Sequence, residues 1–518
     1  MCIIVHCELF HWRIIIIMRL LNLSMSQLLW VFIATKLLTR LKPSKLFLRW
    51  LASYGLKSYR VPTDEELRKI QYSKKQEKKD TKQVKQKPGS NSQPSSSEPP
   101  MRANEFKIRC SDLVKLNLTT TDINYNTLNA LPLGDDLEWR VDFAFMALVS
   151  FLLTQTLFYF SPRSNEYNFS LVWIFLIILQ CLTILIQISA VYFQNKKASG
   201  ERSIVIVAGI LFLLLALFIL STDGTHLELK VDESIQLLSQ VQQRRPVEDA
   251  LLDADQIDTP PPTQAKPFVN LFLKLTTALF CSVVGAILTF PGFRFGQMHE
   301  SILADATTSK VRKIICNINL LSPLVVVCLW IPNISRNPLK KQAFVPIDDD
   351  RFETIRLYIL ILTSLLRFIM VRRYIAAFLL STVNYRLAQL RRKCGFTSNK
   401  TIQLLVSNLN IFTNAATIQY ILPTILCLFT SIMFASYTHY NKHTVDEDSA
   451  KRFASLRYLF GNDQEAMIES AEELMFRIRR VFSSELAKNL LGFATWWIHF
   501  AWLCTTSVGV AYYKYFEH

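Results

Sequence analysis

The sequence predicts an all-α, polytopic integral membrane protein, a bundle of about nine spanning helices, or eight if the first apolar segment is a signal peptide. Three observations lead to this prediction. Half of the 518 residues are hydrophobic, and they are gathered in blocks. Each block is close to the roughly 20 apolar residues that a helix needs to cross about 30 Å of hydrocarbon. The polar segments between the blocks differ in the sign of their charge, as topology requires.

The first apolar block is the weakest, because Asn22, Ser24 and Lys36 dilute it. Its denser basic cluster follows the apolar core, whereas a signal peptide carries its basic residues in front. A retained helix is therefore favoured over a cleaved signal peptide or an interfacial helix. The nine candidate spans are residues 20–38, 141–161, 169–194, 203–221, 269–290, 313–331, 354–371, 416–437 and 491–513.

The polar stretches between the blocks predict linkers. A Lys/Gln-rich run at 74–87 and a Ser/Pro-rich run at 88–100 cannot bury enough apolar surface to fold, so disorder is expected there. The chain then divides into an extension (1–24), a weak first helix or signal peptide (25–41), a basic, partly disordered segment (42–140), three helices (141–221), an acidic flexible loop (222–268), three helices (269–371), a basic amphipathic cytosolic segment (372–402), a kinked helix (403–437), a polar loop with an amphipathic helix at 471–485 (438–490), and a last helix with a short tail (491–518).

Loop charges predict the topology, since loops rich in Lys and Arg stay in the cytosol. Residues 42–100 carry 14 basic and 6 acidic side chains, and residues 372–400 carry 7 basic and none acidic. Residues 222–267 carry 9 acidic and 4 basic side chains. If nine helices alternate, the two basic segments share the cytosolic side and the acidic one lies opposite. The N-terminus is then outside and the C-terminus inside.

The formal net charge of +17 sits mainly beside apolar blocks, which indicates contact with anionic lipid. The sequence contains neither an aromatic-rich basic module nor a zinc finger, so nucleic acid is not an expected partner. The ten cysteines form no CxxC pair, which argues against a zinc ribbon or a redox motif.

Motifs typical of enzymes are absent from the sequence: no GxSxG, HExxH, P-loop or GxGxxG occurs. We expect no catalytic residues, no metal ligands and no cofactor. An enzyme of an unrecognised kind stays open as an alternative.

Polar groups inside the predicted spans are candidate functional residues, because a charge there costs roughly 2.5–3.5 kcal/mol on insertion scales. Arg367 is the sharpest case, and Arg356 lies about three helical turns earlier. The alternative for both is that they snorkel to the membrane surfaces. A hydrated pathway would bring Arg367 together with Gln180, Asn317 and Gln419. Interhelical hydrogen bonding explains such polar groups equally well, including Asp142, Asn319 and His499.

Small residues predict a helix contact in the fifth block, where Ala278, Ser282 and Ala286 recur every four residues. Thr505 and Gly509 repeat that spacing in the last block. Pro323 and Pro423 are expected to kink their helices, and Pro291 with Gly292 is expected to end the fifth helix at the membrane surface.

Two sequons on the predicted outer side, at Asn168 and Asn333, are possible N-glycosylation sites. Both lie against a helix end, so poor access for the glycosylation enzyme is expected.

The end of the fifth block resembles the signature of the transmembrane protein 161 family. The matching residues are Thr289, Phe290, Pro291, Gly292, Arg294, Gln297 and His299, with further similarity at 62–68, 168–173, 200–203 and 493–497. The resemblance runs from about Met25 to the C-terminus. It implies a multi-pass membrane glycoprotein linked to control of cation currents in excitable cells and to stress resistance. It supplies no established functional residues.

Three hypotheses follow for a protein of the plasma membrane or an endomembrane. The first is a non-enzymatic regulator of potassium or calcium currents that contacts ion channels or other membrane proteins. The second is a channel or transporter in its own right, and the third is a membrane enzyme.

Overall fold

A computed structural model describes residues 23–52, 56–69, 106–116, 118–131, 133–160, 168, 170–194, 199–222, 227–231, 234, 267–305, 308–338, 348–392, 395–440 and 484–516. Most of the predicted N-terminal extension and the Lys/Gln- and Ser/Pro-rich runs lie outside these residues. So do most of the acidic loop and nearly all of the predicted amphipathic helix at 471–485.

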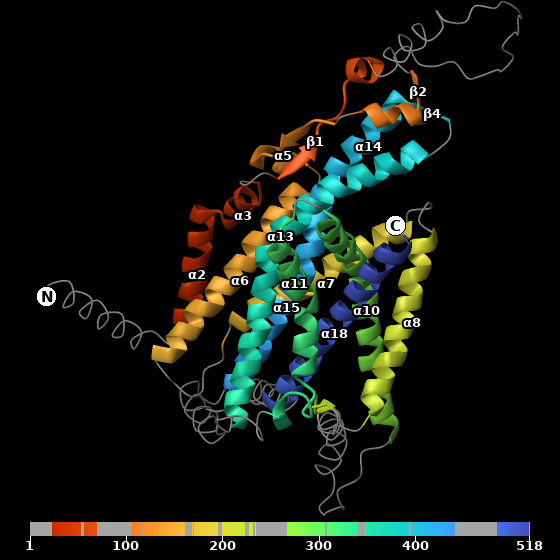
Figure 1. The fold of residues 1–518 in the computed structure, drawn as a ribbon. Helices are drawn as coiled ribbons and strands as arrows, with labels where there is room; N and C mark the ends of the chain where they lie inside the picture. The colour runs from red at the N-terminus through yellow and green to blue at the C-terminus, as the bar shows by residue number, and fades with distance from the viewer. Residues whose placement is uncertain are drawn as a thin grey trace, which may run out of the picture.

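A helix lies at each of the nine predicted positions (Figure 1). In the part of the chain that the structure describes, six of them are long and apolar enough to cross a membrane: α7, α8, α10, α11, α13 and α15. The all-α membrane architecture is therefore supported, but the count of nine spans is not confirmed. The nine helices are α2 (Leu23–Leu41), α6 (Gly134–Phe160), α7 (Ser170–Gln194), α8 (Ser199–Ser221), α10 (Pro267–Ala304), α11 (Lys310–Cys328), α13 (Asp349–Arg392), α15 (Thr413–Tyr440) and α18 (Ser484–Phe516).

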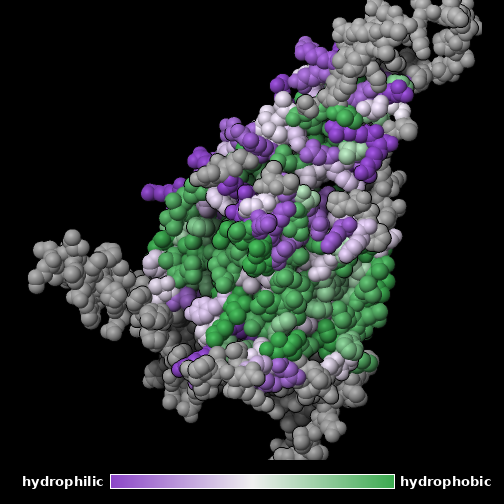
Figure 2. All heavy atoms as spheres, viewed as in Figure 1, coloured by the Kyte–Doolittle hydropathy of each residue, from purple (hydrophilic) through white to green (hydrophobic). Residues whose placement is uncertain are grey.

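The surface has the polarity of a membrane protein. Figure 2 shows hydrophobic side chains over the flanks of the helical bundle and hydrophilic ones gathered at the end that carries the strands. On α8, for example, Ile206, Val207 and Phe218 are exposed and apolar. Exposed apolar side chains in such a continuous belt are expected where lipid, not water, is the solvent.

The central part of the last helix, α18, is mostly buried from Phe493 to Trp502 and packs against α10, α11 and α15. Its buried indoles donate hydrogen bonds to neighbouring helices: Trp497 Nε1 to the Cys281 carbonyl at 3.0 Å and Trp496 Nε1 to the Val327 carbonyl at 3.4 Å. Because other helices surround it, α18 can carry Trp, Thr and His, which lower its average hydropathy. A hydropathy window therefore underrates a helix in this position.

Two predicted boundaries are wrong. The fifth helix was expected to stop at Pro291, but α10 continues through it to Ala304. A proline inside a membrane bundle is tolerated when neighbouring helices satisfy or shield the freed backbone groups, and both Pro291 and Gly292 are buried here.

The seventh span was expected to end at 371 and to be followed by a separate surface segment, 372–402. Instead, α13 is one helix of 44 residues, roughly 66 Å long at 1.5 Å per residue. Its buried side chains continue past the expected end with Tyr374, Ile375, Phe378 and Leu379. This apolar stripe keeps the helix against the bundle past residue 371, and a helix of this length exceeds the roughly 30 Å of a hydrocarbon core.

The projecting end of α13 carries a small polar cap with two short antiparallel sheets (Figure 1). Strand β1 (Lys57–Tyr59) pairs with β3 (Thr120–Asp122), and β2 (Lys107–Arg109) pairs with β4 (Phe396–Ser398). Leu67, Ile108 and Leu113 pack on Leu387 and Ile402. The remaining elements of this cap are η1 (Cys110–Lys115), α5 (Tyr125–Ala130) and α14 (Asn399–Ile411).

A short helix, α3 (Pro43–Ala52), joins α2 to this cap and is fixed to α6. The Asp142 carboxylate accepts hydrogen bonds from Ser44 N at 2.8 Å and Ser44 Oγ at 3.0 Å. Asp142 thus satisfies a free backbone N–H in the first turn of α3, as an N-terminal cap does.

Candidate functional site

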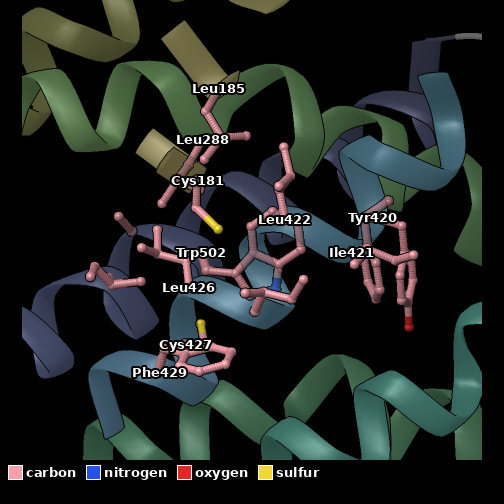
Figure 3. Close-up of a cluster of buried hydrophobic side chains, with 14 of the residues drawn as sticks. Cys181, Leu185, Leu288, Tyr420, Ile421, Leu422, Leu426, Cys427, Phe429 and Trp502 are labelled. Carbon is pink, nitrogen blue, oxygen red and sulfur yellow. The ribbon is translucent and has the colours of Figure 1, made fainter. Parts of the chain in front are cut away.

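Arg367 is a cation in the interior of the bundle that has no hydrogen-bond partner among the described residues. Its side chain is 3% exposed, and its guanidinium carbon lies 5.5 Å from the centre of the Trp502 ring. Within the described residues, Nε, Nη1 and Nη2 of Arg367 all lack a hydrogen-bond acceptor. Figure 3 shows Trp502 among Leu422, Leu426 and Cys427, so the ring that faces Arg367 is itself packed in an apolar part of the core. Arg367 therefore does not snorkel to the membrane surface, which was the alternative that the sequence left open.

A chain of polar groups from four helices lies beside Arg367. Tyr420 Oη donates to the Arg367 carbonyl at 3.0 Å. Asn319 Nδ2 donates to Tyr374 Oη at 3.3 Å and to Tyr420 Oη at 3.5 Å. Tyr374 Oη lies 3.2 Å from His299 Nδ1. The chain joins α10, α11, α13 and α15.

One aromatic ring covers this chain of polar groups. Phe295 on α10 stacks on Tyr374 with ring centres 4.9 Å apart, and it lies 5.7 Å from Tyr420 and 5.8 Å from Trp502. Asn319 is fully buried, and within the described part of the chain its Oδ1 finds no donor. The cluster is thus enclosed by aromatic and apolar side chains.

Close packing of α10 on α18 explains the glycines of the motif at 289–299. A Cβ added at Gly292 would lie 2.6 Å from the Thr505 side chain, and one added at Gly296 would overlap the backbone of Gly509. Small residues that let two helix backbones meet are typical of membrane helix pairs. On the same side of α10, Phe295 lies 5.8 Å from Trp502 of α18, and His299 Nδ1 lies 3.2 Å from Tyr374 Oη of α13.

Arg294, in the same motif, is held by its own set of contacts. Its Nη1 donates to Gln297 Oε1 at 2.8 Å and its Nε to Gln419 Oε1 at 3.3 Å. The guanidinium also lies over the Phe378 ring at 5.1 Å. The hydrogen bond from Arg294 to Gln419 therefore links α10, which carries the motif, to α15.

The predicted polar residues only partly come together. Arg367 is buried, and Gln419 lies on the neighbouring helix with Arg294 as its partner. Asn317 is exposed on α11 but its side chain is hydrogen-bonded to His299, and Asn319, two residues later, is fully buried in the cluster. Gln180 is half-buried on α7 and belongs to no part of this cluster.

The two tyrosines were missed by sequence reasoning. Tyr374 follows Arg367 by seven residues, so both lie on one face of α13 two turns apart. That spacing was the available signal. Tyr420 gave no signal, because only the crossing of α13 and α15 brings it to Arg367.

The small-residue stripe of α10 faces α8. Ser282 Oγ donates to the Gly209 carbonyl at 2.7 Å, and Ala286 lies beside Gly209. Ala278 is fully buried.

Both possible glycosylation sequons lie at helix ends. Asn168 Oδ1 accepts from the backbone and hydroxyl of Ser170 at the start of α7. Asn333 accepts a hydrogen bond from Asn337, and Ser335 is buried with its hydroxyl bound to the Ile331 carbonyl.

Among the described residues, no group of three or more His, Cys, Asp or Glu side chains could hold a metal ion. The fold and the buried cation together define a class: a polytopic, all-α membrane protein with a charged, enclosed core.

The comparison with family models agrees with that class. The model described as predicted transmembrane protein 161AB matches residues 23–517, and the chain belongs to this family. No solved structure matches it.

Proposed function

We propose that this chain is a non-enzymatic regulator of cation currents, potassium or calcium, that acts on other membrane proteins and does not conduct ions itself. The observation that supports this proposal is the isolated, enclosed charge of Arg367. The link to currents comes from the family resemblance, which also suggests a part in the stress response.

A cation crossing the interior of the bundle would meet this charge. Two unit charges 4 Å apart interact by about 4 kcal/mol at an effective dielectric constant of 20. Arg367 has no carboxylate partner among the described residues to cancel that repulsion. Channels and pores use fixed positive groups in this way to exclude cations. Such a core argues against conduction of K⁺ or Ca²⁺ through this bundle.

The outer face of the bundle offers an apolar surface through which a regulator can contact other membrane proteins. The exposed apolar side chains of α8, such as Ile210, Leu211 and Leu214, suit contact with lipid or with the helices of another membrane protein. The alternative is a channel or transporter in its own right, in which Arg367 would be part of a pathway.

The proposal is tested by whole-cell recording of cation currents in cells that express the wild-type chain, Arg367→Met or Arg312→Met. Arg312 is an exposed arginine on α11 and serves as the matched control. We expect the wild type and Arg312→Met to change the currents of the host cell and Arg367→Met to lose that effect. Equal effects of all three chains would count against a role for the buried charge.

A further inference from the structure

A cavity of about 410 Å³ lies away from the Arg367 cluster, where α8 ends and α13 begins. Loop charges predict that this end of the bundle faces outward, because the acidic insert starts there. The cavity lies at the ends of two candidate spans, Arg202–Ser221 and Arg351–Arg392, where lipid headgroups are expected. Its charged lining is Glu228, Lys230, Arg336, Glu353, Arg356 and Lys488.

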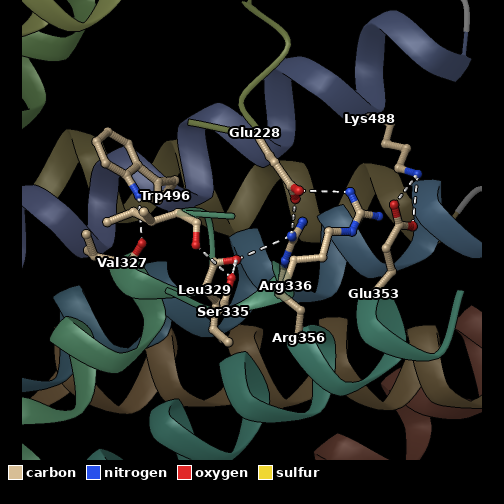
Figure 4. A network of polar contacts seen from close by, with 10 residues as sticks. Glu228, Val327, Leu329, Ser335, Arg336, Glu353, Arg356, Lys488 and Trp496 are labelled. Atoms are coloured by element: carbon tan, nitrogen blue, oxygen red, sulfur yellow. Dashed lines mark hydrogen bonds and ion pairs between the residues drawn. The ribbon is translucent and has the colours of Figure 1, made fainter. Parts of the chain in front are cut away.

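Both carboxylates of this cavity are already engaged. Glu228 accepts from Arg336 Nη1 and from Arg356 Nη2, each at 2.8 Å, so both of its oxygens are used (Figure 4). Glu353 is bound by Lys488 Nζ at 3.1 and 3.4 Å. Among the described lining residues, four cations thus outnumber two carboxylates.

Arg356 supplies a buried donor that the described residues leave unused. The side chain is 6% exposed and lies between the rings of Trp330 and Phe352, at 4.8 and 5.0 Å. Its Nη2 donates to Glu228 and to the Leu329 carbonyl. Its Nε is buried without an acceptor. Donors exceed acceptors here, so a ligand that fits must be rich in acceptors.

The rest of the lining is apolar and includes Leu220, Trp330 and Phe434. A pocket that combines apolar walls with a few converging charged groups is typical of ligand sites. Arginine pairs well with phosphate because its planar fork donates several hydrogen bonds at once.

We propose that this cavity binds a phosphate-bearing anion, supplied by a membrane lipid headgroup or by free phosphate. Arg356, Arg336 and Lys488 provide the positive charge, and the apolar wall accommodates the first part of an acyl chain. The proposal is independent of the proposed regulation of currents.

The test uses the purified full-length chain in neutral detergent and native mass spectrometry. Three probes are added in turn: dioleoyl phosphatidic acid, dioleoylglycerol, which has the same chains without the phosphate, and inorganic phosphate. We expect phosphatidic acid to bind and dioleoylglycerol not to. Arg356→Gln and Lys488→Gln are expected to weaken phosphatidic acid binding at least about tenfold, since each removes charge-assisted hydrogen bonds. Arg312→Gln, an exposed control, should bind as the wild type does.

Each outcome decides the proposal. Phosphatidic acid binding that both variants weaken identifies a lipid headgroup, and binding of inorganic phosphate alone with the same dependence identifies free phosphate. If neither phosphatidic acid nor inorganic phosphate binds, or if the wild type and both variants bind equally, the proposal is overturned. If Arg356→Gln does not elute as a folded monodisperse protein, Lys488→Gln, which leaves the two arginines in place, gives the answer.

Discussion

The guanidinium of Arg367 lies 5.5 Å from the centre of the Trp502 ring and has no hydrogen-bond acceptor among the described residues. Arg356, eleven residues earlier in α13, is equally buried but bonds to Glu228. Among the described residues, α13 therefore carries one buried arginine with a carboxylate partner and one without a hydrogen-bond acceptor. Arg356 can therefore stabilise the bundle through its carboxylate partner, whereas Arg367 costs stability and is a candidate for a functional role.

Substituting these two arginines with methionine should have opposite effects on stability. Removing an uncompensated buried charge relieves a desolvation penalty of several kcal/mol, against a cation–π loss of about 2 kcal/mol. Arg367→Met should therefore melt at or above the temperature of the wild type. Arg356→Met should lose about 1.5–3 kcal/mol, because a charged hydrogen bond to Glu228 is removed. Thermal unfolding in detergent, followed by tryptophan fluorescence, measures both, and a large destabilisation by Arg367→Met would contradict the unpaired state.

The contact between α10 and α18 should tolerate no added methyl group. Gly296→Ala places a Cβ against the backbone of Gly509, where neither helix can move without repacking, and should cost about 1–3 kcal/mol. Gly209→Ala is the matched control, because its Cβ would meet Ala286 at an ordinary 3.6 Å. The comparison is made by thermal unfolding of the two variants. Equal melting temperatures would mean that α10 and α18 are not in backbone contact.

Asp142 should stabilise α3 from a distance of almost one hundred residues in the chain. Asp142→Ala removes the acceptor for Ser44 N and Oγ and should cost about 0.5–2 kcal/mol, as loss of a helix cap does. The control is Asp135→Ala, because Asp135 is exposed in the first turn of α6, the helix that also carries Asp142. Limited proteolysis should cut faster near residues 42–52 in the first variant alone. Unchanged cleavage in Asp142→Ala would show that the α3–α6 contact is dispensable.

The thiols of the buried cysteines should be inaccessible to water. Cys181 and Cys316 are each 1% exposed, so a membrane-impermeant thiol reagent should leave both unmodified in folded, membrane-inserted protein. Each is tested as the only cysteine left, with Asn333→Cys added in a second series as an accessible positive control. Labelling of Cys316, which lies beside Tyr374, would reveal a hydrated route into the polar cluster.

Much of the architecture could be predicted from the sequence, because membrane helices are encoded locally. Apolar length alone marked helices at the positions of α7 and α8. The errors came from neighbours that no local pattern contains. Pro291 predicts a helix end until α18 is seen to pack on Gly292 beside it. The basic residues after 371 suggest a surface segment and hide the buried stripe of Tyr374 and Phe378.

The buried cluster was only half predictable for the same reason. The cost of a charge in the membrane singled out Arg367 from the sequence. Asn319 could not be singled out as the buried member of the cluster, because its burial depends on the rotation of α11 within the bundle. Tyr420 could not be found, because only the crossing of α13 and α15 brings it to Arg367. The strands were missed because β2 and β4 pair across almost 290 residues, a distance at which alternation of polar and apolar residues carries no information.

The most direct test of the account is cation flux into liposomes that contain the purified chain, with orientation and folding verified. K⁺ and Ca²⁺ uptake is compared for the wild type, Arg367→Met and empty liposomes. The account predicts that neither protein raises uptake above that of empty liposomes. In the wild type the enclosed charge excludes cations, and in Arg367→Met an apolar side chain replaces that charge in a core that stays packed. Robust uptake by the wild type that Arg367→Met abolishes or alters would contradict it and make the chain a channel or transporter.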